Sequence, residues 1–95
     1  MAAYLLVAIT VTDPARFAAY RDAAPAVIAA HGGRYIVRGG DVETLEGTHD
    51  GRRIVILEFP SMEALHGFWN SREYARVKTL REGAAEFDVL ALQGM

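Results

Sequence analysis

Three side chains in this sequence combine a reactive group with an informative position: His31, Arg38 and Glu58. His31 precedes a glycine pair that ends an expected helix, and an imidazole that titrates near neutrality suits general acid/base catalysis. The alternative is a histidine that the helix dipole favours at a cap. Arg38 precedes Gly39 and Gly40, and a guanidinium binds carboxylate or phosphate through two parallel hydrogen bonds. A β-bulge also explains this glycine pair.

Glu58 is the most unusual of the three. Strict alternation along its strand places it with Ile54 and Ile56, on a face that we expect to be buried in a dimer. A carboxylate there must form an ion pair, accept hydrogen bonds or have a raised pKa. Arg34 or Arg38, from the same chain or from a partner, is the expected counter-ion. Glu58 is therefore predicted either as a second acid/base group or as half of a structural ion pair.

Four aromatic residues with polar tips are predicted around the helix–sheet layer: Tyr20, Tyr35, Trp69 and Tyr74. They are the expected walls of a pocket for a small planar ligand. The alternative is that they belong to the core, because aromatic residues at helical spacing usually pack there.

Several functions are excluded by what the sequence lacks. There is no cysteine, and the three histidines have no metal-ligand spacing, so no metal site is predicted. The net charge of −2 opposes nucleic-acid binding, and no apolar run approaches the roughly 20 residues that span a bilayer. Nucleotide-binding and hydrolase motifs are also absent. We therefore expect a cytoplasmic protein of one domain, residues 1–95, with no cofactor.

Hydrophobic periodicity predicts the elements that must position these residues. Strands are expected at Tyr4–Val11, Arg34–Arg38 with a continuation over Asp41–Glu46, Arg53–Phe59 and Phe87–Leu92. Helices are expected from Asp13-Pro14 to Gly32-Gly33, from Ser61 through Trp69, and from Ser71 to Gly83. Pro25 is expected to interrupt and kink the first helix. A hairpin turn at residues 48–51 would bring Glu46 opposite Arg53.

Two successive strand–helix–strand units of this kind predict an α+β, ferredoxin-like βαββαβ fold. Its four-stranded antiparallel sheet would carry the helices on one face only. The other face would then expose the apolar side chains Leu6, Ala8, Ile54 and Ile56. Burial of this patch against a second copy is the simplest remedy, so the sequence predicts a homodimer formed through the sheet faces.

Several short motifs resemble one known family. They are His31-Gly32-Gly33, Arg38-Gly39-Gly40, Glu46-Gly47, Glu58-Phe59-Pro60-Ser61-Met62, and Phe68-Trp69-Asn70-Ser71 with Tyr74. With these motifs the chain resembles the domain-of-unknown-function thirteen-thirty family, and the resemblance covers nearly its whole length. This resemblance implies a dimeric α/β barrel, in which two ferredoxin-like sheets pack face to face. It carries no established reaction.

The functional hypothesis is a small-molecule-binding dimer. By analogy with the superfamily, its enzymatic form would be a cofactor-free oxygenase or an isomerase acting on a small planar organic substrate. His31 would carry the proton, Arg38 would hold an anion, Glu58 would be the second acid/base group, and Trp69 and Tyr74 would form walls. One alternative is a non-catalytic ligand-sensing or structural dimer. Another is a haem-handling protein with His31 or His66 as axial ligand.

Overall fold

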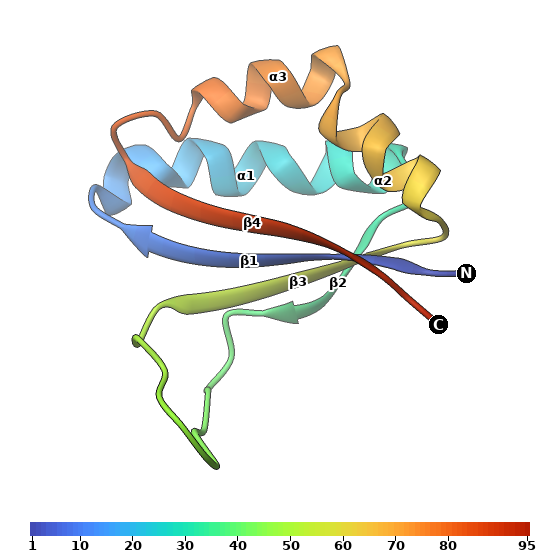
Figure 1. Ribbon diagram of the computed structural model, residues 1–95. Helices are drawn as coiled ribbons and strands as arrows, with labels where there is room; N and C mark the ends of the chain where they lie inside the picture. The colour runs from blue at the N-terminus through green and yellow to red at the C-terminus, as the bar shows by residue number, and fades with distance from the viewer.

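One antiparallel sheet carries three helices on a single face in the computed structural model, which describes residues 1–95 (Figure 1). The strands are β1 (Ala3–Val11), β2 (Arg34–Arg38), β3 (Arg53–Phe59) and β4 (Ala85–Gln93), in the spatial order β2-β3-β1-β4. The helices are α1 (Pro14–Ala30), α2 (Met62–Trp69) and α3 (Arg72–Thr79). This confirms the predicted α+β, ferredoxin-like βαββαβ architecture.

Local capping chemistry determines where α1 begins and ends. The Asp13 carboxylate accepts a hydrogen bond from the Arg16 amide at 3.2 Å, and Pro14 occupies the first helical position. Gly32 adopts a φ of +81° directly after the helix. The expected interruption at Pro25 is wrong, because α1 runs unbroken through that residue. A proline removes one backbone donor and crowds the carbonyl of the preceding turn, and the burial of Ala24 and Ile28 against the sheet offsets that cost.

Serine caps start the two shorter helices. Ser61 accepts from the Ala64 amide at 3.0 Å, and Ser71 accepts from the Tyr74 amide at 3.1 Å. The Ser71 hydroxyl also donates to the Phe68 carbonyl at 2.7 Å, which ties the end of α2 to the start of α3. The break predicted between these helices is therefore present.

The core lies between the helices and the inner face of the sheet. Alternate residues of β1, namely Ala3, Leu5, Val7 and Ile9, are buried, as period-2 alternation requires. The largest fully buried side chains are Phe59, Phe68 and Leu65. The inner face is thus almost wholly apolar, and a charged residue on it stands out.

The outer face of the sheet has no helix over it (Figure 1). Cross-strand pairing places Leu6 beside both Ile56 and Leu90, and Ala8 beside Ile54. Leu90 and Leu92 are 57% and 43% exposed. The apolar patch predicted from the sequence is therefore present on this face.

The segment between β2 and β3 corrects a second expectation. The predicted strand Asp41–Glu46 does not form, and residues 41–51 are exposed and irregular. Glu46 consequently does not face Arg53, which pairs across the sheet with Ile9. An alternating pattern forms a strand only where a neighbouring strand supplies hydrogen bonds, and β3 begins at Arg53, beyond reach of this segment. The segment projects from the sheet on the side opposite the helices (Figure 1).

No helix is both long and apolar enough to cross a lipid bilayer.

Candidate functional site

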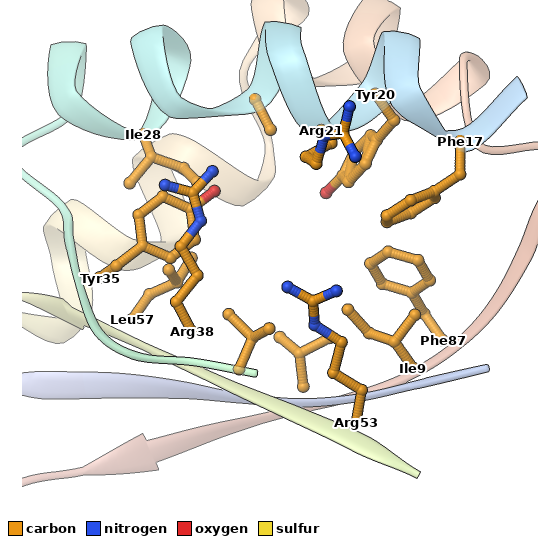
Figure 2. Close-up of a pocket in the computed structure, with 13 residues that line it drawn as sticks. Ile9, Phe17, Tyr20, Arg21, Ile28, Tyr35, Arg38, Arg53, Leu57 and Phe87 are labelled. Atoms are coloured by element: carbon orange, nitrogen blue, oxygen red, sulfur yellow. The ribbon is translucent and has the colours of Figure 1, made fainter. Parts of the chain in front are cut away.

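A cavity of about 60 Å³ lies between α1 and the inner face of the sheet (Figure 2). Ten of its thirteen lining residues are hydrophobic, and its aromatic walls are Phe17, Tyr20, Tyr35 and Phe87. The other three lining residues are arginines: Arg21, Arg38 and Arg53. Such a volume holds only a few water molecules. A ring-sized ligand would therefore also extend between the exposed, flexible arginine side chains.

The three arginines reach the cavity from three different elements. Arg21 follows Tyr20 on α1, Arg38 ends β2 and Arg53 begins β3. Figure 2 shows the guanidinium groups of Arg38 and Arg53 rising from the sheet, while that of Arg21 lies at the edge of the helix that faces the sheet. Positive charge thus converges on one apolar space from both layers.

A β-bulge turns Arg38 toward the cavity. The pairing of β2 with β3 shifts between Tyr35 and Val37, so Tyr35 lies opposite Leu57 and Arg38 opposite Val55. Leu57 and Val55 are both buried on the inner face. Without the extra residue, Ile36, strict alternation would send Arg38 to the outer face beside Arg34. Of the two counter-ions expected for Glu58, Arg34 is therefore the one that pairs with it within the chain, and Arg38 lies on the other face of the sheet.

Arg38 and Arg53 form no ion pair, and no carboxylate lines the cavity. Arg21 lies 3.5 Å from Asp22, but both side chains are largely exposed and the contact is weak. The Arg38 guanidinium instead stacks over the Tyr35 ring at 4.3 Å. The cavity therefore has a cationic rim that the protein itself does not neutralise, which is the arrangement that attracts an anion.

Gly39 determines where Arg53 lies. Its φ is +71°, and its amide donates to the Ile54 carbonyl at 2.9 Å. A Cβ atom built on Gly39 would overlap the Arg53 guanidinium. The Arg53 side chain thus packs on the bare Cα of Gly39; the backbone conformation requires the glycine, and a Cβ atom there would displace the end of the Arg53 side chain.

Tyr20 provides the cavity with a hydroxyl group. Its oxygen lies 2.8 Å from the Tyr74 oxygen in a buried pair. Burial raises the pKa of Tyr20 well above its ordinary value, and the neighbouring Tyr74 raises it further. Burial also raises the pKa of Tyr35, and Arg38 partly opposes that rise. Tyr20 therefore stays neutral, and its hydroxyl is available for hydrogen bonding but not as a general base.

The predicted residues do not all meet at this cavity. Arg38, Tyr20 and Tyr35 line it, whereas Tyr74 touches it only through the Tyr20 hydroxyl. Trp69 is half-buried against Tyr74, with the Lys78 ammonium 4.5 Å from its ring centre.

His31 and Glu58 lie away from the cavity. His31 is the C-cap of α1, and its Nε2 lies 3.8 Å from a Glu73 carboxylate oxygen. Glu58 lies on the outer sheet face, where the Arg34 Nε donates to it at 2.7 Å. The three residues predicted as catalytic therefore occupy three separate places.

Sequence reasoning missed Arg21 and Arg53. A signal for Arg53 was present, because alternation places it on the same face as Val55, Leu57 and Phe59, where a charge is unexpected. Arg21 offered no comparable signal, since an arginine beside the apolar stripe of a helix is common. The described residues also contain no group of three His, Asp or Glu side chains that could hold a metal ion.

The chain belongs to the family described as "Domain of unknown function (DUF1330)". That family matches residues 2–95. A search of the curated proteins finds no match.

Solved structures share the fold at low sequence identity. A protein of unknown function from Rhodopseudomonas palustris superposes with a TM-score of 0.76 at 19% identity, over 99% of this chain and 82% of that one. SnoaB, a cofactor-independent oxygenase from Streptomyces nogalater, superposes with a TM-score of 0.64 at 14% identity, over 99% of this chain and 93% of that one. A dimeric ferredoxin-like protein of unknown function from Jannaschia sp. CCS1 superposes with a TM-score of 0.66 at 14% identity, over 99% of this chain and 100% of that one. At these identities the likeness concerns the fold of this DUF1330 protein.

Proposed function

We propose that this DUF1330 protein binds a small planar organic anion in the cavity between α1 and the sheet. The observation that carries the proposal is the set of three arginines, none of them paired with an acid inside the cavity, around an otherwise apolar space. Arg38 and Arg53 have no carboxylate partner, so a bound anion would relieve the repulsion between these like charges. In this proposal Arg38, Arg53 and Arg21 bind the anionic group.

The aromatic walls favour a planar molecule. Guanidinium groups stack on flat π-systems, as Arg38 already does on Tyr35. Phe17, Tyr20 and Phe87 form one cluster, with ring centres 5.5–6.2 Å apart. A flat ring carrying a carboxylate would place its ring against this cluster and its charge at the arginines.

Ligand binding without catalysis by the chain's own acid/base groups is the better supported form of this function. The cavity contains no carboxylate and no imidazole, and the raised pKa of Tyr20 makes its phenolate inaccessible near neutrality. A cofactor-free oxygenase or an isomerase, the enzymatic alternative, would need a substrate acidic enough to ionise beside the arginines. Oxygen uptake in the presence of such a substrate distinguishes the two.

We also propose a homodimer formed through the outer sheet faces. The support is the apolar surface around Leu6, Ile54, Ile56, Leu90 and Leu92, which no helix covers and which residues 48–52 border on one side. The Arg34–Glu58 pair at its edge would then belong to the interface. Sedimentation or native mass spectrometry should give a dimer mass, and Ile56→Asp should lower it toward the monomer. A monomeric wild type would overturn this part.

The binding proposal is tested with a charged and a neutral ligand of the same shape. Benzoate should cause saturable NMR shifts at Tyr35, Arg38 and Arg53, whereas benzamide should bind more weakly because it lacks the charge. Inorganic phosphate controls for anion binding without a ring. Equal binding of benzoate and benzamide, or shifts confined to other residues, would contradict the proposal.

A further inference from the structure

The buried tyrosine pair contains one hydroxyl proton more than the protein uses. Tyr20 and Tyr74 each carry one hydroxyl proton, and a single hydrogen bond of 2.8 Å joins their oxygens. Neither hydroxyl has another partner. One of the two protons therefore lies between the oxygens, and the other proton has no acceptor. A buried hydroxyl that cannot donate its proton is unfavourable.

The surroundings decide which tyrosine keeps the unused proton. Tyr74 is 3% exposed and does not line the cavity, so a proton left on its oxygen would remain buried without an acceptor. Tyr20 does line the cavity, and its hydroxyl oxygen points into that space (Figure 2). Donation from Tyr74 to Tyr20 avoids the buried unsatisfied donor and directs the Tyr20 proton into the cavity.

A positively charged side chain, Arg81, lies beside the tyrosine pair. The Arg81 guanidinium lies 3.8 Å from the centre of the Phe87 ring and 5.8 Å from that of Tyr20. Its Nε is buried and has no hydrogen-bond partner. The Tyr20 oxygen is thus the one acceptor within hydrogen-bond distance of the Tyr74 hydroxyl, and Arg81 adds a further donor beside the pair.

We infer that Tyr20 recognises an oxygen acceptor on the ligand, so that the ligand is a planar organic anion that also carries a carbonyl, hydroxyl or ether oxygen. This inference rests on the function proposed above and narrows its ligand class. The arginines bind the anionic group, and the Tyr20 hydroxyl donates to the second oxygen. Tyr74 does not line the cavity, and in this arrangement its hydroxyl only donates to the Tyr20 oxygen, so it makes no contact with the ligand.

The test compares matched ligands that differ in one atom. Methoxybenzoates carry an ether oxygen where ethylbenzoates carry a methylene group, and the 2-, 3- and 4-isomers sample the position of the acceptor. Wild-type protein should bind at least one methoxybenzoate about 2- to 12-fold more tightly than its ethyl counterpart, the range expected for one net hydrogen bond.

Two variants assign that preference to Tyr20. The double variant Tyr20→Phe/Tyr74→Phe removes both hydroxyls and leaves neither unpaired, so its methoxy-to-ethyl preference should fall to about 1. Tyr74→Phe is the matched control, in which Tyr20 can still donate and the preference should persist. The wild-type ligand series needs no variant, so it remains decisive where a variant folds poorly.

The outcomes separate the two proposals. If benzoate binds but no methoxy isomer is preferred, or if the preference survives in the double variant, the Tyr20 inference is wrong and anion binding stands. If benzoate itself does not bind, the proposed function fails and the inference fails with it.

Discussion

Replacing Gly39 with alanine tests the whole geometry of the site through one methyl group. Gly39 combines a φ of +71° with direct packing of the Arg53 guanidinium on its Cα. Gly39→Ala introduces backbone strain and also forces the Arg53 side chain to move. The first effect should lower stability, and the second should weaken anion binding.

The two effects have different sizes. Holding a non-glycine residue in the left-handed region costs about 1–2 kcal/mol. For a domain of this length each kcal/mol corresponds to roughly 4–8 °C in melting temperature, so a fall of about 4–16 °C is expected. Loss of one solvent-exposed arginine contact to benzoate should cost about 0.5–1.5 kcal/mol, or roughly 2- to 12-fold in Kd.

Gly47→Ala is the matched control. Gly47 has a φ of +83°, but no atom lies within 4 Å of a Cβ built there. It should therefore show the backbone cost and leave benzoate affinity unchanged. Thermal unfolding at one protein concentration and benzoate titration by calorimetry measure the two quantities separately. Wild-type affinity in Gly39→Ala, or equal weakening in Gly47→Ala, would refute the placement of Arg53 by Gly39.

Two further predictions concern the arginine rim and a helix cap. Arg53→Met should weaken benzoate binding roughly 2- to 12-fold while leaving the melting temperature unchanged or slightly higher, because it removes one of several like charges without breaking an ion pair. Arg76→Met, on the exposed surface of α3, removes the same charge and should leave binding unchanged; a marked loss of stability in Arg53→Met would instead indicate a structural role. Ser71→Ala should lower the free energy of unfolding by about 1 kcal/mol, because it removes the bonds to the Tyr74 amide and the Phe68 carbonyl. Urea denaturation measures this loss, and an unchanged midpoint would show that solvent replaces the cap.

Most of the fold could be predicted from the sequence because its signals are local. Asp13-Pro14, Ser61 and Ser71 cap helices through atoms within three residues, so the capping pattern can be recognised in the chain itself. Alternation along β1 likewise identifies the buried and the open face. The strand predicted at Asp41–Glu46 failed because strand formation also depends on a partner, which no local pattern reports.

The site was predicted only in part. Tyr20, Tyr35 and Arg38 were named from residue type and do line the cavity. The bulge at Ile36, which turns Arg38 inward, depends on hydrogen bonds to β3 and is not encoded in the alternation of β2 alone.

The sequence by itself determined most of the secondary structure, the sheet's two faces and the apolar patch that favours a second copy. Only the tertiary structure brought Arg21, Arg38 and Arg53 together and separated His31 and Glu58 from them. The physical reason is the distance along the chain over which each kind of interaction acts. Capping and periodicity act between residues a few positions apart. The cationic cavity exists only once α1 packs on the sheet and the β2–β3 pairing sets which way each arginine points.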